Sequence, residues 1–245
     1  MKRIVTLLCT LAMALTLGAC SSGAGEEAVQ EEPLSPADQL LVDVSGTYDE
    51  LFTVICDPQY DQLWLEDCEA LVGPDMAADA ADMLKSACTG TIYGDEAAAA
   101  YADDPEAAQF DCYFINGPAQ ITFDGNTISG VDANGNEVFS HEYAYVQDLS
   151  LDGMMDGYLY ATEDADAGEF KYFFMMPDTP GSTYHIEFRY GSDIDALTHY
   201  AEGPYAYWLA AGILTDADDQ MIEDVIGLFC EENLADQGEQ EAQAA

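Results

Sequence analysis

The chain has 245 residues, with 48 acidic and 5 basic side chains and a formal net charge of −43 at pH 7. Binding to nucleic acid requires several Lys or Arg side chains that neutralise phosphates, so this balance excludes a nucleic-acid partner. Hydrophobic residues make up 49% and aromatic residues 11% of the chain, which is too many for a disordered protein. The sequence therefore predicts a folded domain with an acidic surface.

Residues 1–19 have the layout of an export signal. Lys2 and Arg3 are followed by an apolar stretch over residues 4–15 and by a small-residue cleavage site. A membrane-spanning helix needs about 20 apolar residues, and this stretch is shorter. The run LGAC ending at Cys20 resembles the bacterial lipobox, which implies that Cys20 carries a diacylglycerol. Two acyl chains suffice for stable anchoring, so we expect a lipoprotein of the cell envelope on the outer face of a bacterial membrane. The alternative is an ordinary secretory signal with a chance cysteine.

The composition predicts a single folded domain between two flexible segments. Residues 20–33 are mostly small or acidic and predict a flexible, lipidated tether. The folded domain is expected over residues 34–232. Residues 233–245 end in QGEQEAQAA and are predicted to be a disordered acidic tail.

The first part of this domain, residues 34–90, is predicted to be helical. Ser35 is a capping residue followed by proline at the first helical position. Apolar residues at helical spacing then recur over residues 48–55, 60–71 and 76–87. These stripes are expected to form core.

From about Phe110 the apolar period changes to two, which predicts strands. Turn sequences such as Asp-Gly and Asn-Gly separate them and favour hairpins. The expected strands cover residues 110–115, 120–123, 127–131, 137–146, 157–161, 170–176 and 183–190. Consecutive antiparallel strands in one small domain suggest a barrel or half-barrel. Helices are expected at 192–201, at 204–211 and from Thr215 onward, and this order indicates an α+β fold.

Export would place the remaining cysteines in an oxidising compartment. They contain no CxxC spacing, so neither a zinc knuckle nor a thioredoxin-like site is indicated. We expect disulfides among Cys56, Cys68, Cys88 and Cys112, with Cys230 as a small buried hydrophobic residue.

Motifs of known enzyme chemistry are missing from the sequence. There is no GxGxxG, P-loop or GxSxG motif. His141-Glu142 begins like HExxH, but Tyr145 stands at the second histidine and the segment is expected to be a strand. Residues 132–136 resemble a calcium-binding loop only in part and are read as a hairpin turn. The sequence does not predict an enzyme.

Several segments resemble the ZinT family. They are SGTYDELF at residues 45–52, FKYFF at 170–174, YHIEFRYGSD at 184–193 and the helix over 221–229. ZinT-like proteins are exported zinc-binding proteins. The resemblance covers roughly residues 45–60 and 120–230, and it implies an antiparallel calycin-type, lipocalin-like β-barrel with N-terminal helices and flanking C-terminal helices.

The resemblance carries over only part of the family's zinc site. His185 matches the second histidine of the family's HxH pair, Thr183 stands at the first, and Asp178 is the nearest match to an earlier histidine. Glu187 lies two residues beyond His185 and shares its face of the strand, which we expect to point into the barrel. The resemblance therefore implies zinc at His185, Asp178 and Glu187. The alternative is a structural histidine in a barrel without metal.

Three classes of function remain open. The first is a membrane-anchored lipoprotein that binds zinc or another divalent metal ion. The second is a calycin-like binder of a small apolar ligand. The third is a surface interaction module without metal. Tyrosines on the predicted strands that could line a ligand cavity, or equally form core, are Tyr143, Tyr145, Tyr158, Tyr160, Tyr172 and Tyr184.

Overall fold

The computed structural model of the chain describes residues 33–244. Leu34 to Ala245 form one compact unit. The predicted signal at 1–19, the lipidation site Cys20 and nearly all of the tether lie outside the described residues. Within the described part, no helix is long and apolar enough to cross a membrane.

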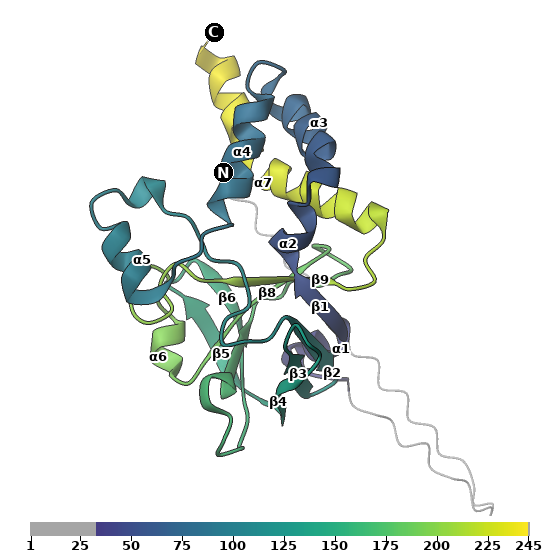
Figure 1. The fold of residues 1–245 in the computed structure, drawn as a ribbon, viewed down its shortest axis with the longest axis vertical. Coiled ribbons are helices and arrows are strands. Elements are labelled where there is room, and N and C mark those ends of the chain that lie inside the picture. The colour runs from purple at the N-terminus through teal and green to yellow at the C-terminus, as the bar shows by residue number, and fades with distance from the viewer. Residues whose placement is uncertain (1–32, 245) are drawn as a thin grey trace, which may run out of the picture. The chain divides into compact units, whose positions relative to one another are not determined.

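The centre of the fold is a nine-stranded sheet in which all neighbouring strands are antiparallel, in the order β4-β3-β2-β1-β9-β8-β7-β6-β5. The strands are β1 (Gly46–Glu50), β2 (Gln120–Asp124), β3 (Thr127–Val131), β4 (Glu137–Glu142), β5 (Ala144–Leu151), β6 (Met155–Ala161), β7 (Tyr172–Met175), β8 (Ile186–Gly191) and β9 (Ala210–Leu214). Only Tyr143 separates the two edge strands, β4 and β5, in the sequence. The sheet therefore curls into a half-barrel, and the predicted α+β class with an antiparallel curled sheet is confirmed (Figure 1).

Helices surround this sheet. They are α1 (Pro36–Asp43), α2 (Leu51–Ile55), α3 (Asp61–Val72), α4 (Ala77–Ala87), α5 (Gly94–Ala100), α6 (Ile194–Leu197) and α7 (Asp219–Ala244), with 3-10 turns η1 (Pro58–Tyr60), η2 (Pro105–Ala107) and η3 (Gly168–Phe170). Figure 1 shows α2, α3, α4 and α7 gathered on one side of the sheet. The Ser35 hydroxyl accepts a hydrogen bond from the Asp38 amide at 3.1 Å, as the predicted capping motif requires.

The end of α7 departs from the sequence prediction. The helix continues to Ala244, whereas residues 233–245 are predicted to be disordered. Glu, Gln and Ala, which dominate this segment, are strong helix formers. Leu234 is also buried against the helical core, which gives the helix a tertiary contact beyond residue 232.

The concave face of the sheet encloses an aromatic core. Phe139 and Phe170 stack with ring centroids 4.0 Å apart, and Phe173, Phe188 and Tyr190 are fully buried beside them. Because large side chains fill this space, the half-barrel interior is packed core rather than a ligand cavity.

The tyrosines on the strands divide between this core and the surface. The hydroxyl of Tyr143 donates to the Phe170 carbonyl, and that of Tyr160 donates to the Ala37 carbonyl at 2.6 Å. Tyr145 is 42% exposed. Buried hydroxyls with backbone partners are typical of structural tyrosines.

A second core lies between the outer face of the central strands and the helices. Ala211 and Ile213 of β9 pack there with residues of α2, α3, α4 and α7. Trp64 is fully buried, and its indole N–H donates to the Ile55 carbonyl at 2.8 Å. The helices are therefore held by apolar burial against the sheet.

Several sequence predictions of secondary structure were wrong. The helical stripe expected from Tyr48 begins only at Leu51, because residues 46–50 form strand β1. The helix expected over 204–211 is absent, and residues 210–214 form strand β9. β9 lies in the middle of the sheet with both faces covered, so its apolar residues lack a period of two. Residues 110–115 form no strand and contribute isolated bridges at Asp111.

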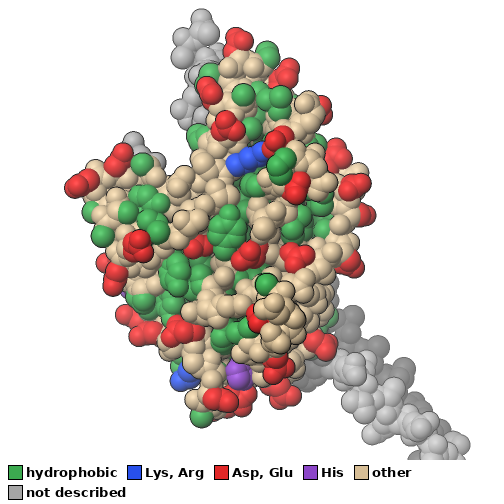
Figure 2. Space-filling view, in the orientation of Figure 1, with side chains coloured by type: hydrophobic (Ala, Val, Ile, Leu, Met, Phe, Trp, Pro, Cys, Tyr) green, Lys and Arg blue, Asp and Glu red, His purple; other side chains and the backbone are tan. Residues whose placement is uncertain are grey.

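The surface is acidic, as the composition predicts. In Figure 2, Asp and Glu side chains are scattered over the visible face, with few Lys or Arg between them. A field of this sign raises the local concentration of cations.

Candidate metal-binding site

Strand β8 and the loop before it position the residues that the sequence singles out. Ile186, Phe188 and Tyr190 point into the aromatic core, so Glu187, which alternates with them, lies on the opposite face. Its partner on β9 is Ala211, which belongs to the core beneath the helices. The expectation that this face points into the barrel is therefore wrong. The large apolar residues at even positions take the interior, and Glu187 faces the helical side.

His185 precedes β8 and has a defined orientation. Its Nδ1 atom lies 2.7 Å from the Thr183 carbonyl oxygen, and its Nε2 atom lies 3.6 Å from Oε1 of Glu187. A carbonyl accepts only from a protonated nitrogen, so Nδ1 carries the proton in the neutral ring. Nε2 is then the atom with a free electron pair, and it faces a carboxylate. Ligating histidines are commonly held through their other nitrogen in this way.

The turn before His185 supplies that carbonyl. Thr183 is bound back to Thr179, since the Thr183 amide donates to the Thr179 carbonyl at 2.9 Å. Tyr184 has φ of 65°, in the left-handed region that non-glycine residues seldom adopt. This turn directs the Thr183 carbonyl at the imidazole that follows. Thr183 therefore acts on His185 through its backbone carbonyl.

The carboxylate of Asp178 interacts electrostatically with His185 and Glu187. Burial, the charge of Glu187 and the charge of Glu232 raise the pKa of Asp178 to about 6, against a lowering by His185. For His185, burial lowers the pKa, but the Glu187 carboxylate, the Thr183 carbonyl and the charge of Asp178 raise it, and the net pKa is above the ordinary value. The fold thus brings the three predicted residues into one neighbourhood.

Glu232 was not predicted as part of this site. It is an exposed residue of α7 and reaches the site only because the last helix returns to the sheet. No local motif marks it, so tertiary structure alone identifies it.

The donor set fits a divalent metal ion, but the ligands are not preassembled. Zinc accepts imidazole nitrogen and carboxylate oxygen, usually with four ligands at about 2.0–2.2 Å. Across residues 33–244, no group of three His, Cys, Asp or Glu side chains is arranged to hold a metal ion. Binding at His185 therefore requires the Asp178 and Glu187 side chains to move toward Nε2.

The other two histidines are each paired with an aspartate. His141 Nδ1 lies 2.9 Å from Asp164 Oδ2, and His199 Nδ1 lies 3.3 Å from Asp152 Oδ1. Neither has a match in the family's zinc motif. They are suitable controls for an experiment on His185.

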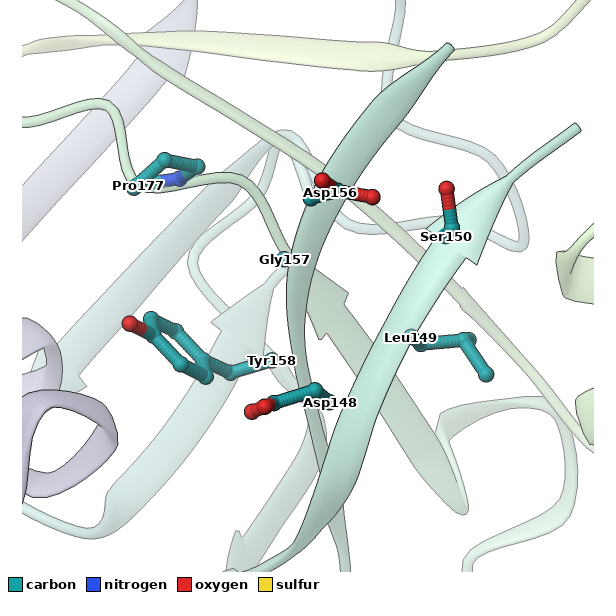
Figure 3. Close-up of a pocket in the computed structure, with 7 residues that line it drawn as sticks. All are labelled: Asp148, Leu149, Ser150, Asp156, Gly157, Tyr158 and Pro177. Atoms are coloured by element: carbon teal, nitrogen blue, oxygen red, sulfur yellow. The ribbon is translucent and has the colours of Figure 1, made fainter. Parts of the chain in front are cut away.

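A surface pocket of about 460 Å³ lies beside strands β5 and β6. Figure 3 shows Asp148 and Ser150 from β5, Asp156 and Tyr158 from β6, and Pro177 across from them. The lining contains two carboxylates and no histidine, cysteine or basic residue. The pocket therefore lacks the nitrogen and sulfur ligands that zinc prefers, and it has no basic side chain to pair with an anionic ligand.

The five described cysteines are free thiols in the structure, so the disulfides expected from the sequence remain a prediction. Cys68, expected to pair with Cys56, Cys88 or Cys112, lies 3.7 Å from Cys230 between their sulfur atoms. Cys230 is buried as expected, but it has a cysteine partner in contact. Helix α7 packs on α3, a non-local contact that cysteine spacing does not reveal.

Comparison with known proteins gives a structural likeness only. No family model and no curated protein matches the chain. The structure is similar to a ZinT-like domain. The match is to the Zn(II)-bound ZinT-like domain of Streptococcus pneumoniae AdcA, with 17% identity, a TM-score of 0.48 and coverage of 82% of this chain and 94% of that one.

Zn(II)-bound AdcA from the same organism matches with 18% identity and a TM-score of 0.46, over 75% of this chain and 34% of that chain. This chain therefore spans about a third of the length of AdcA.

Proposed function

We propose that this protein is an extracytoplasmic lipoprotein that binds zinc, or another divalent metal ion, at His185 together with Glu187 and Asp178. Its role is binding rather than catalysis. The observation that carries the proposal is the orientation of His185, whose Nδ1 is engaged by the Thr183 carbonyl while Nε2 faces Glu187 at 3.6 Å.

The charge around His185 supports a cation as the ligand. Two carboxylates next to one imidazole repel each other, and the raised pKa of Asp178 reflects that repulsion together with burial. A divalent cation relieves it by neutralising both carboxylates at once. The sequence resemblance to ZinT-like proteins favours zinc among the divalent ions, and the imidazole ligand agrees with that preference.

Zinc affinity of the His185→Ala variant tests this proposal. We expect binding by the full chain at pH 7.5 to weaken by at least about tenfold, because the only nitrogen ligand of the set is lost. The measurement is zinc titration against a chelating indicator of known affinity. The matched controls are His141→Ala and His199→Ala, which remove an imidazole paired with aspartate elsewhere and should bind zinc like the parent. Equal zinc uptake by His185→Ala and the parent would refute the site.

The lipid anchor has a separate test. In the producing bacterium, the parent chain should incorporate a labelled fatty acid and sediment with membranes, and Cys20→Ala should lose the label entirely because its thiol is the acceptor. Cys9→Ala is the control, since Cys9 lies in the segment expected to be cleaved. Labelling that persists in Cys20→Ala would show that the chain is not anchored at this residue.

A further inference from the structure

Four of the cysteines lie in two neighbouring pairs. Cys68 is on α3 and Cys230 is on α7, and their sulfur atoms are 3.7 Å apart. Both residues are fully buried. The helices that carry them pack against each other within the helical core, so no rearrangement of the fold is needed to bring the sulfur atoms together.

Cys88 and Cys112 form the second pair. An antiparallel bridge joins Thr89 to Asp111, which places Cys88 directly opposite Cys112. Residues opposite one another in an antiparallel pair have Cα atoms about 4.5–5.5 Å apart, inside the range of about 4.4–6.8 Å found for disulfides.

Cys56 is the fifth thiol. It lies near Cys88 and Lys85, and burial raises its pKa to about 11. Since the other four cysteines fall into the two pairs above, Cys56 remains without a pairing partner among the five described cysteines.

We propose that the mature protein contains two disulfide bonds, Cys68–Cys230 and Cys88–Cys112, and one free thiol at Cys56. Each bond forms when two thiols lose their protons and transfer two electrons to an external disulfide. That oxidant is a low-molecular-weight or protein disulfide of an oxidising compartment, and it is reduced to two thiols. The proposal rests on the contact of Cys68 with Cys230, on the register of Cys88 with Cys112 and on the export in the proposed function, and it is independent of metal binding.

The Cys68–Cys230 bond would tie the last helix to the body of the fold. The bond would fix α7 to α3, and it would close a long loop of the chain. Long loops are those in which a cross-link most reduces the entropy of the unfolded state.

Trypsin separates the possible pairings because the chain has so few basic residues. Beyond residue 3, the cleavage sites are Lys85, Lys171 and Arg189. In the mature chain, the fragment ending at Lys85 holds Cys56 and Cys68 besides the lipidated Cys20, the next holds Cys88 and Cys112, and the fragment after Arg189 holds Cys230. The proposed Cys68–Cys230 bond joins the fragment ending at Lys85 to the fragment after Arg189. The proposed Cys88–Cys112 bond lies within the single fragment between Lys85 and Lys171.

The experiment uses the full chain purified without reductant and alkylated in denaturant before digestion. We expect mass spectrometry to find the first and last cysteine fragments joined, and the middle fragment unalkylated and lighter by two hydrogen atoms. Cys68→Ser should abolish the link, and Cys56→Ser, the matched control on the same fragment, should keep it. An alkylated Cys230, or a link from the middle fragment to either of the other two cysteine fragments, would overturn the proposal.

Thermal unfolding gives a second measurement. Reduction should lower the melting temperature of the parent and of Cys56→Ser alike, since both carry the two bonds. The difference between oxidised and reduced protein should shrink in Cys68→Ser, which retains one bond. An unchanged melting temperature on reduction of the parent would contradict the proposed bonds.

Discussion

Replacing Arg189 by methionine should destabilise the protein by about 3–5 kcal/mol, because buried carbonyl groups lose their donors. Arg189 is fully buried on β8. Its Nη1 donates to the carbonyls of Leu197 at 2.9 Å and His199 at 2.8 Å, and its Nη2 donates to the carbonyl of Tyr205. Methionine retains much of the apolar volume but offers no donor.

The loss of stability should be concentrated in the segment between α6 and β9, which carries the three carbonyl acceptors. Burial lowers the pKa of Arg189 to about 10, against raising effects of Tyr200, Asp152 and Tyr205, so the guanidinium remains charged at neutral pH. No carboxylate pairs with it within the described part of the chain. Its role is to satisfy backbone carbonyls and thereby hold residues 197–205 against the sheet.

Equilibrium urea unfolding at pH 7 measures this effect. The matched control is Lys171→Met, which removes an exposed positive charge and should change the free energy of unfolding by no more than about 0.5 kcal/mol. If Arg189→Met and Lys171→Met unfold at the same urea concentration, the three carbonyls do not depend on the guanidinium.

Zinc affinity should fall by on the order of 100-fold between pH 7.5 and pH 5.5, since protons compete for both His185 and Asp178. Zinc needs neutral imidazole and an ionised carboxylate. The pKa of His185 is raised above its ordinary value and that of Asp178 is raised to about 6. Both groups therefore take up protons as the pH falls through this window, and each proton must leave before zinc binds.

The slope of affinity against pH distinguishes the specific site from diffuse attraction to the acidic surface. Ordinary carboxylates titrate near about 4, so cations attracted by the surface alone should stay bound at pH 5.5. Asp178→Asn should make the slope shallower by removing one of the two titrating groups, and His199→Ala should leave it unchanged. Equal affinity at both pH values would contradict binding at His185.

Local features of the fold could be predicted from the sequence. The hairpin of β2 and β3 was expected from alternating residues around Asp124-Gly125-Asn126, because a short turn fixes such a pairing within a few residues. Strands β1 and β9 were missed since they pair across the whole chain, with Tyr48 opposite Leu214. Gly212 lies against Tyr48, where a Cβ atom would meet the tyrosine Cβ at 3.2 Å. Nothing near Gly212 in the sequence indicates this contact.

For the candidate site as well, only the relations between residues close in the sequence could be predicted. The spacing of two residues placed His185 and Glu187 on one face of a strand, and their 3.6 Å contact agrees with that expectation. The face of β8 that carries Glu187 is set by the packing of Phe188 and Tyr190 into the aromatic core. That packing depends on how the whole sheet curls, so the spacing of residues does not reveal it. Glu232 and the contact of Cys68 with Cys230 depend on α7 returning to the body of the fold, so spacing alone could not show them.

The position of β1 has a consequence for how the chain folds. β1 lies between β2 and β9, and its pairing with β9 joins residues near the two ends of the described chain. Contacts of such high sequence separation slow folding, because the entropy of closing a long loop is lost before the contact forms. The sheet cannot be completed until residue 214 has been synthesised, and until then β1 and β8 present unpaired edges. A nascent chain of this kind therefore exposes two strand edges until late in its synthesis, and exposed edges of this kind are prone to aggregation.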